Sequence, residues 1–206
     1  IVTNGLKLAD EDYCRAVCET RTPVLLAFDG RDPEIYRRLR RNPKAYEKKL
    51  RADVIKSPRP RHVAIIMDGN RRFAREIGLS TQEGHQMGRN KLEEVLEWCL
   101  DVEVRVLTVY AFSTENLTRQ MAEVEELMDL FERNFRLLGD DERVHEHRIR
   151  VRVLGQIEYL PANVQESIRY AEERTEAYDG YHFNVAVAYG GREEIVMAVK
   201  SIASDV

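Results

Sequence analysis

The sequence predicts an α/β fold, a single domain with a largely parallel central sheet flanked by helices and with an N-terminal extension. From residue 62 onward, four short apolar runs are each followed by a segment whose apolar residues recur at helical spacing. This alternation of strand and helix is typical of parallel sheets with right-handed crossovers. The 206 residues are enough for one sizeable core or at most two small ones.

The predicted strands and helices follow one another in a regular order. The strands are expected at residues 63–67, 104–112, 149–155 and 182–189. The helices are indicated by apolar stripes, by Pro161 at a helix start and by Gly-Gly-Arg before the last helix. The stripes contain Leu92, Val95, Leu96, Cys99, Leu100, Val124, Leu127, Met128, Phe131, Phe135, Leu138, Val164, Ile168 and Ala171. The first run is continuously apolar, which predicts a buried strand.

Residues 1–60 are predicted to be an accessory N-terminal region, partly helical, and residues 61–206 the core domain. Residues 22–30 have the pattern of a strand and turn, and residues 33–55 that of a basic helix interrupted at Pro43. Pro58 and Pro60 mark an element boundary. The basic helix is either an ordinary solvated face or a surface that contacts a membrane or a partner.

The composition excludes several classes of protein. A net charge of −4 and a pI near 5.8 argue against nucleic-acid binding, which requires a basic face. Cys14, Cys18 and Cys99 are too few for a disulfide framework, so a reducing, cytoplasmic setting is expected. The sequence contains neither a signal peptide nor a run of 18 apolar residues.

Three of the four predicted strands end in polar residues that packing does not need. These residues are Asp68, Gly69, Asn70, Arg71 and Arg72 after the first strand, Ser113, Thr114, Glu115 and Asn116 with Arg119 after the second, and Gly190, Gly191 and Arg192 after the fourth. Because the strands are predicted to be parallel, all three corners are expected at one edge of the sheet, where α/β proteins bind ligands.

These residues indicate a site for phosphate groups. Arginines grip phosphate oxygens in pairs, and glycines let backbone amides approach an oxyanion. Asp68 would repel a phosphate, and a divalent cation between the two resolves the conflict. Mg²⁺ fits, since it often combines one or two carboxylates with substrate phosphates.

Each corner also has a plainer interpretation. Residues 68–70 can form a turn and helix N-cap, residues 113–116 a capping segment, and the glycine pair a tight turn. His85 can be a structural polar residue. The sequence contains no P-loop, no G-x-G-x-x-G after a strand and no G-x-S-x-G elbow. A phosphate site without an evident nucleophile suggests chemistry driven by loss of a diphosphate leaving group.

Four segments resemble the successive signature blocks of the cis-prenyltransferases: "HVAIIMDGNRRFA", "EGHQMG", "VYAFSTENLTR" and "AYGGREEI". The double arginine resembles the archaeal and eukaryotic branches. The resemblance implies a cis-prenyltransferase fold and a transferase that condenses isopentenyl diphosphate with an allylic prenyl diphosphate, forming a Z double bond with Mg²⁺. It also implies a homodimer, with a hetero-partner as the alternative, and a cytoplasmic enzyme for which peripheral membrane contact at product release stays open.

The resemblance also assigns roles to single residues. It implies that Asp68 is the essential acid serving Mg²⁺ and the allylic diphosphate, and that Asn116 takes part in proton removal from isopentenyl diphosphate. Because a neutral amide is a poor base, we expect Asn116 to orient the substrate instead. The substrate-binding positions implied by the resemblance are Gly69, Asn70, Arg71, Arg72, Phe73, His85, Ser113, Thr114, Glu115 and Arg119.

The family's apolar tunnel and two departures from its pattern bear on the prediction. Met87, Leu92 and the stripe at residues 124–135 either line the tunnel or form ordinary core. Thr81 stands where the family often has an arginine for the allylic phosphates. The family's last block, rich in arginine and with a later acid for Mg²⁺, is not in this sequence, and we expect it beyond Val206 in a longer protein.

Two rival functions belong to other classes. One is a non-catalytic partner subunit of a heteromeric cis-prenyltransferase, although Asp68 and Asn70 are retained here and such subunits tend to lose them. The other is a magnesium phosphohydrolase, which would want a second carboxylate near Asp68 and a placed nucleophile.

Overall fold

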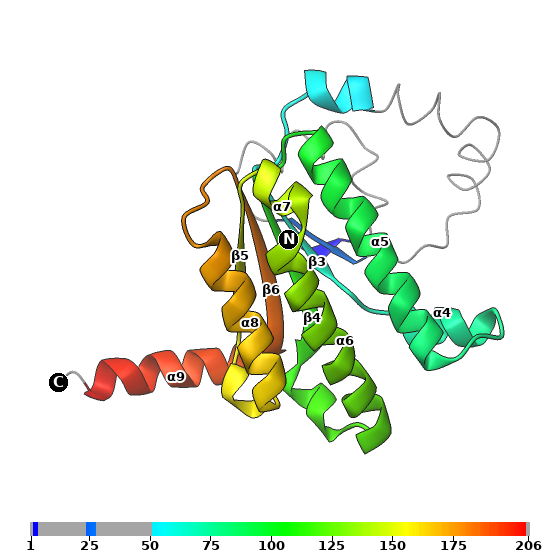
Figure 1. Ribbon diagram of the computed structural model, residues 1–206, viewed down its shortest axis with the longest axis vertical. Coiled ribbons are helices and arrows are strands. Elements are labelled where there is room, and N and C mark those ends of the chain that lie inside the picture. Colours follow the sequence, from blue (N-terminus) through cyan, green and yellow to red (C-terminus); the bar gives the residue numbers. More distant parts are fainter. Residues whose placement is uncertain (1, 4–23, 28–50, 205–206) are drawn as a thin grey trace. The chain divides into compact units, whose positions relative to one another are not determined.

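The computed structural model describes residues 2–3, 24–27 and 51–204, and the chain forms two compact units, unit 1 (Ile1–Leu107) and unit 2 (Thr108–Val206). Parallel strands alternate with helices along the chain, so the predicted α/β class is confirmed (Figure 1). The elements in chain order are β1 Val2–Thr3, β2 Val24–Ala27, β3 His62–Ile66, α4 Asn70–Glu76, α5 Thr81–Asp101, β4 Val106–Ser113, η2 Thr114–Thr118, α6 Met121–Asp140, α7 Glu142–Glu146, β5 Ile149–Leu154, η3 Ile157–Tyr159, α8 Ala162–Thr175, β6 Tyr181–Tyr189 and α9 Gly191–Ser204.

The described residues of unit 1 form three parallel strands in the order β1-β2-β3, followed by the helices α4 and α5. Val24 to Ala27 form a strand as predicted for residues 22–30. The predicted basic helix is observed only over residues 51–56, and the rest of it lies outside the described residues, as do Cys14 and Cys18. The boundary predicted between residues 60 and 61 stays a prediction.

The prediction of a buried first strand is only partly right. β3 forms and pairs with β2, but Ile65 alone is buried, with 9% of its surface exposed. The other residues of the run are half-buried. Within unit 1, α4 packs mainly against α5. The continuous apolar run therefore indicated a strand correctly, but it did not indicate how far that strand is buried.

Unit 2 contains three strands in the order β4-β6-β5, and β6 and β5 pair in parallel from Tyr181 opposite Ile149 to Ala186 opposite Leu154. Four successive residues of β6, Val185 to Ala188, are buried. Because successive side chains of a strand point to opposite faces, β6 is covered on both faces, as expected of a strand between two others. β5 alternates buried apolar residues with arginines, as the sequence predicts.

The core of unit 2 is formed by α6 and α8 against the strands. Phe112 of β4 lies edge-on to Phe131 of α6, with ring centroids 5.9 Å apart, and Phe131 lies 6.3 Å from Phe135. Ile168 of α8 has no exposed surface. In the predicted stripe at residues 124–138, Leu127, Met128 and Phe135 are buried and the other members are half-buried. That part of this stripe lines an apolar tunnel stays a prediction.

Side chains of α8 satisfy the free edge of β5. The Val151 amide donates to Thr175 Oγ1 at 3.1 Å, and the Val153 amide donates to a Glu172 carboxylate oxygen at 2.8 Å. An edge strand with unpaired amides invites pairing with another chain. These two bonds cap that edge within the described part of the chain.

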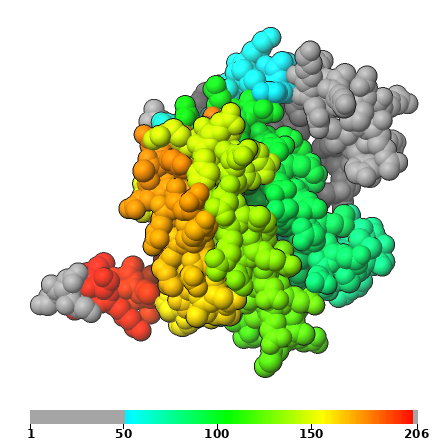
Figure 2. All heavy atoms as spheres, viewed as in Figure 1, coloured from blue at the N-terminus to red at the C-terminus, as the bar shows by residue number. Residues whose placement is uncertain are grey.

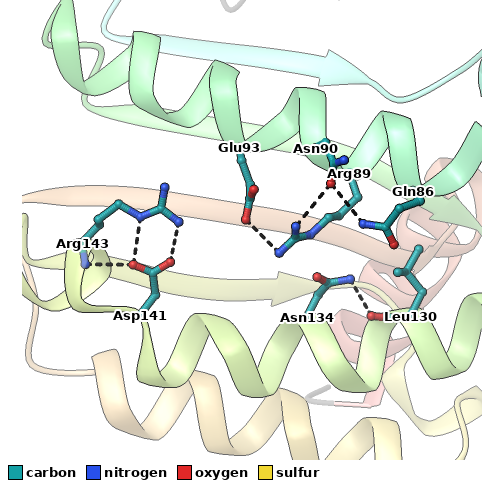
Figure 3. A network of polar contacts seen from close by, with 8 residues as sticks. All are labelled: Gln86, Arg89, Asn90, Glu93, Leu130, Asn134, Asp141 and Arg143. Carbon is teal, nitrogen blue, oxygen red and sulfur yellow. Dashed lines mark hydrogen bonds and ion pairs between the residues drawn. The ribbon is translucent and has the colours of Figure 1, made fainter.

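Local capping fixes several helix ends. Ser80 and Glu83 form a reciprocal capping box at the start of α5. Farther along α5, Arg89 pairs with Glu93 at 2.8 Å, as Figure 3 shows. In unit 2, Asp141 accepts from the Arg143 amide and guanidinium at the start of α7 (Figure 3).

α9 extends from the end of β6 as the last described helix (Figure 2, red). It exposes a set of large apolar side chains: Ile195, Val196, Met197, Val199 and Ile202. Contiguous exposed apolar surface of this kind marks interaction sites more often than ordinary surface.

Candidate active site

The corner after β3 presents an exposed acid. Asp68 has 78% of its side chain exposed, and one of its oxygens accepts from the Gly69 amide at 2.6 Å. Gly69 has φ 92°, a left-handed conformation that favours glycine, and it is the N-cap of α4 without a side-chain capping bond. The N-cap alternative for this corner therefore does not explain Asp68, whose carboxylate caps no helix.

Positive charge accompanies this acid. Arg72 lies one turn into α4, and its guanidinium is 3.4 Å from the second oxygen of Asp68. Arg71, Arg72 and Phe73 are all exposed, with Phe73 at 50%. An exposed pair of this kind adds little to stability, which leaves both the carboxylate and the guanidinium accessible to a ligand.

The first turns of α5 hold Asn70 in place. A Cβ built on Gly84 would lie 2.6 Å from the Asn70 carbonyl oxygen, and one built on Gly88 would lie 2.7 Å from Asn70 Cγ. Only glycine permits this approach, so the two glycines of "EGHQMG" form a groove for Asn70. His85 lies between them on α5 and is half-buried. Asn70, at the start of α4, thus packs against the first turns of α5, the helix that carries His85.

The turn after β4 orients Asn116. Ser113 and Asn116 form a reciprocal capping box, in which the Ser113 amide donates to Asn116 Oδ1 at 3.0 Å and the Asn116 amide donates to the Ser113 hydroxyl. The capping interpretation of this segment is therefore correct. It has a chemical consequence: the amide oxygen of Asn116 is occupied, and its NH₂ group is what remains to be offered to a ligand.

The ends of β4 and β6 lie together, as predicted for two of the three corners. A Cβ on Gly190 would lie 2.9 Å from Thr114 Oγ1 and would also collide with the Glu193 carboxylate. Arg192 is exposed in the first turn of α9. A side chain at position 190 would therefore displace the Glu193 carboxylate and the Thr114 hydroxyl.

Arg119 is held by an ion pair near this turn. Its guanidinium lies 2.9 Å from a Glu123 carboxylate oxygen, with the side chains 26% and 16% exposed. One edge of the guanidinium is thus fixed by α6, which limits the orientations in which Arg119 can approach an anion.

The donor set fits Mg²⁺ only as an ion shared with a substrate. Among the residues that the structure describes, no group of three or more His, Cys, Asp or Glu side chains could hold a metal. Asp68 offers one exposed carboxylate, which matches the habit of Mg²⁺ to bind through one or two carboxylates and substrate phosphates. No described helix is both long and apolar enough to cross a membrane.

Comparison with known families decides the identity. A family model described as "Putative undecaprenyl diphosphate synthase" matches residues 66–206, which include all three polar corners. The chain belongs to the cis-prenyltransferase family.

Relatives and solved structures agree with this assignment. A "Tritrans,polycis-undecaprenyl-diphosphate synthase (geranylgeranyl-diphosphate specific)" of Methanopyrus kandleri is 52% identical over 79% of this chain and 60% of its own length. The protein of the same name from Pyrococcus horikoshii is 54% identical over 78% and 61%. Lavandulyl diphosphate synthase from Lavandula x intermedia, solved with dimethylallyl diphosphate, has TM-score 0.67 and 39% identity over 71% of this chain and 62% of its own. The chain thus spans about three fifths of the relatives' length.

Several residues of this cis-prenyltransferase chain were not predicted from its sequence. Gly84 and Gly88 shape the Asn70 groove, and their four-residue spacing is a signal of close packing that sequence reasoning could have used. Tyr110 lies within β4 and Tyr189 at the end of β6, and their contact joins positions 79 residues apart, which no local pattern indicates. Thr81, the departure from the family pattern, is the first residue of α5 and is half-buried.

Proposed function

We propose that this chain belongs to a transferase that condenses isopentenyl diphosphate with an allylic prenyl diphosphate into a Z polyprenyl diphosphate. One observation carries the proposal: the exposed Asp68 carboxylate caps no helix and lies beside an exposed guanidinium. Burial and helix capping do not account for this arrangement, whereas binding of a metal diphosphate does. The family membership and the names of the relatives support the same reaction.

The proposed roles divide between the two units. In unit 1, Asp68 shares Mg²⁺ with the allylic diphosphate, and Gly69, Asn70, Arg71, Arg72, Phe73 and His85 bind that substrate. In unit 2, Ser113, Thr114, Glu115, Asn116 and Arg119 bind isopentenyl diphosphate. The Mg²⁺, when bound, supplies charge neutralisation for the leaving diphosphate.

The reaction needs positioning more than a nucleophile. The C–O bond to the allylic diphosphate breaks, the double bond of isopentenyl diphosphate attacks the carbon it leaves, and a proton is lost. Because Asn116 Oδ1 already accepts from Ser113, Asn116 acts as a donor that orients isopentenyl diphosphate. The proton leaves to another acceptor, for which the departing diphosphate is chemically suited.

The allylic starter is proposed to be geranylgeranyl diphosphate. The relatives in Methanopyrus and Pyrococcus have names that state this specificity. Thr81 supplies no cation where the family often has one, so Arg71 and Arg72 would provide the positive charge for the allylic phosphates.

The setting of the enzyme is also part of the proposal. We place it in the cytoplasm, where a free thiol such as that of Cys99 persists; burial raises the pKa of this thiol to about 11. A homodimer, or a hetero-partner in its place, and peripheral contact with a membrane are supported by the exposed apolar side chains of α9.

The test measures incorporation of radiolabelled isopentenyl diphosphate by the full-length protein, with Mg²⁺ and with a chelator. Asp68→Ala should abolish incorporation, while Asp129→Ala, an exposed acid on α6, should leave it unchanged. Product that appears only after a second, catalytic chain is added would favour the partner-subunit alternative. Incorporation that survives both Asp68→Ala and the chelator would contradict the proposed role of this acid.

A further inference from the structure

A buried alanine near the end of β6 has an unusual backbone conformation. Ala188 has φ 48°, in the left-handed region, and no part of it is exposed. A Cβ makes this conformation costly for residues other than glycine. Asparagine and aspartate can offset the cost through a local side-chain hydrogen bond, which alanine cannot make. The contacts around Ala188 must therefore hold its backbone in place.

Among the described residues, the other non-glycine residues with positive φ have an ordinary explanation. Glu103 and Arg148, with φ 58° and 52°, each directly follow the C-cap residue of a helix. The Glu103 amide donates to the Leu100 carbonyl oxygen at 3.1 Å, and the Arg148 amide makes the equivalent bond to His145 at 3.2 Å. Such a left-handed residue commonly ends a helix. Ala188 lies within a strand, so helix termination does not explain it.

Hydrogen bonds on two sides hold this part of β6. The Ala188 carbonyl oxygen accepts from the amide of Gln156, two residues after the end of β5, at 3.1 Å. The next carbonyl oxygen, that of Tyr189, accepts from the hydroxyl of Tyr110 in β4 at 2.7 Å. The two tyrosine rings meet edge to face, with centroids 5.7 Å apart, a favourable geometry for aromatic pairs. The end of β6 is thus bonded to β4 on one side and to the segment after β5 on the other.

Ala188 lies where the regular pairing of β6 with β5 stops. The paired register runs as far as Ala186 opposite Leu154. The next residue after β5, Gly155, has φ 128°, and a Cβ built on it would collide with the Val187 carbonyl oxygen. The two chains therefore pass in close contact at this point, and the left-handed residue of β6 follows directly.

Beyond Ala188 the chain reaches the turn that follows β4. Two residues on, Gly190 lies so close to Thr114 that a Cβ built on it would be 2.9 Å from Thr114 Oγ1. Thr114 is the first residue of η2. Because the φ and ψ of one residue set the direction of the chain that follows it, an extended residue at position 188 would direct Gly190 elsewhere. The contact of Gly190 with Thr114 therefore depends on the backbone conformation of Ala188.

We propose that Ala188 is a positioning residue: its left-handed backbone places Gly190 against Thr114 and so holds the Thr114 hydroxyl where it binds isopentenyl diphosphate. The inference rests on the proposed function, in which Thr114 belongs to the binding set for that substrate. Ala188 acts through Gly190 and Thr114, and its own side chain is not assigned a substrate contact.

The experiment compares Ala188→Val with Ala186→Val in the full-length protein. A positive φ is strongly disfavoured for a β-branched residue, so valine at position 188 drives the backbone out of its conformation. Ala186 is a matched control, because it is a buried alanine of the same strand, 4% exposed, without a positive φ. Both substitutions add the same two methyl groups to the core of unit 2.

Two further variants separate the backbone conformation from the size of the side chain. Ala188→Gly keeps the left-handed conformation, which glycine adopts readily. Gly190→Ala leaves Ala188 intact and places a methyl group against the Thr114 hydroxyl, so it tests the same link even where Ala188→Val does not fold. The readouts are the melting temperature, kcat, and the KM values for isopentenyl diphosphate and for geranylgeranyl diphosphate.

The proposal predicts that Ala188→Val and Gly190→Ala raise KM for isopentenyl diphosphate by roughly 10- to 100-fold, the effect of losing a hydrogen bond to a charged group. KM for geranylgeranyl diphosphate should stay near that of the wild type, because its proposed binding residues are in unit 1. Ala188→Gly should keep both KM values near those of the wild type. Ala186→Val should lower the melting temperature, as overpacking does, without changing one KM more than the other.

Three results would overturn the inference: both KM values rise together in Ala188→Val, Ala186→Val raises KM for isopentenyl diphosphate as far as Ala188→Val does, or Ala188→Gly does so. If the wild type forms product but neither Ala188→Val nor Gly190→Ala changes KM for isopentenyl diphosphate, the inference alone fails. If the wild type forms no product with any allylic starter, the proposed function fails, and the inference fails with it.

Discussion

The side-chain oxygen of Asn116 accepts a hydrogen bond from the backbone amide of Ser113, at 3.0 Å. The bond is part of a capping box, so a local feature of backbone structure determines which end of the Asn116 amide faces outward. A signature residue that is often associated with proton removal is thereby presented as a donor. The hydrogen bond therefore distinguishes two possible roles of Asn116: a donor that orients the substrate, and a base that removes its proton.

Asn116→Asp tests these roles directly. Aspartate keeps an oxygen for the Ser113 amide but replaces the NH₂ donor with a second, negative oxygen. We expect kcat/KM for isopentenyl diphosphate to fall by roughly 100-fold or more, at least as far as in Asn116→Ala. If Asn116 served as the base, the carboxylate would be the better base, and Asn116→Asp would outperform Asn116→Ala.

Gly88→Ala should damage activity more than stability. The three atoms nearest to a methyl group on Gly88 all belong to the side chain of Asn70, which can swing away. The gain in helix propensity, about 1 kcal/mol, roughly offsets the free-energy cost of displacing the Asn70 side chain. We therefore expect an unfolding free energy near that of the wild type and a loss of activity of roughly 10- to 100-fold, since Asn70 is displaced from the diphosphate corner. Denaturant unfolding and the labelled-substrate assay measure the two quantities.

Gly84→Ala is the matched comparison on the same helix face. Its methyl group would meet the Asn70 backbone carbonyl and the Ala74 methyl, at 2.6 Å and 2.7 Å. Neither can move without shifting α4 against α5, so we expect a loss of about 1–3 kcal/mol in unfolding free energy. Equal effects of the two substitutions on stability would contradict the groove described for Asn70.

Thr175→Val should destabilise unit 2 at the edge of its sheet. Thr175 has no exposed surface, and its hydroxyl accepts from the Val151 amide and donates to the Ala171 carbonyl oxygen. Valine leaves the Val151 amide unsatisfied, at a cost of about 1–3 kcal/mol. Urea unfolding measures the difference, with Ser57→Ala, an exposed hydroxyl, as the control. A loss no larger than that of the control would show that the edge amide finds another acceptor.

Low pH should remove the contribution of Asp141 to the stability of the folded state. The side-chain bond to Arg143 is the main cause that lowers the pKa of Asp141 below its ordinary value of 3.8, ahead of the opposing effect of burial. A carboxyl whose pKa is lower in the folded state stabilises the fold above its unfolded pKa and loses this contribution as pH falls through the folded pKa. The melting temperature of wild type should therefore exceed that of Asp141→Asn at neutral pH, and the gap should close below pH 3.8. A gap that persists at the lowest pH where both fold would contradict this assignment.

The order of elements could be predicted from the sequence because it depends on local periodicity. Each of three features depends on only a few neighbouring residues: the strand that ends before Asp68, the start of the helix after Pro161, and the Gly-Gly-Arg start of α9. The degree of burial was less predictable. β3 has the apolar run of a buried strand, but only Ile65 is buried. Burial depends on which helices pack over a strand, and the residues of the strand itself do not indicate this.

The site was predictable in its residue types and not in its supports. Asp68, Asn70 and Asn116 stand out because packing does not require them. The Tyr110 bond to Tyr189 and the contact of Gly88 with Asn70 join residues from different elements. Such contacts leave no periodic trace in the sequence, although four-residue spacing of the glycines was a readable signal of close helix packing.

The double bond formed in the product tests the central claim most directly. The full-length protein is incubated with labelled isopentenyl diphosphate, geranylgeranyl diphosphate and Mg²⁺, and the geometry of each new double bond is determined by NMR. The account predicts a labelled polyprenyl diphosphate whose new double bonds are all Z, with no product from Asp68→Ala. New double bonds in the E configuration, or no labelled product from any allylic starter, would contradict it.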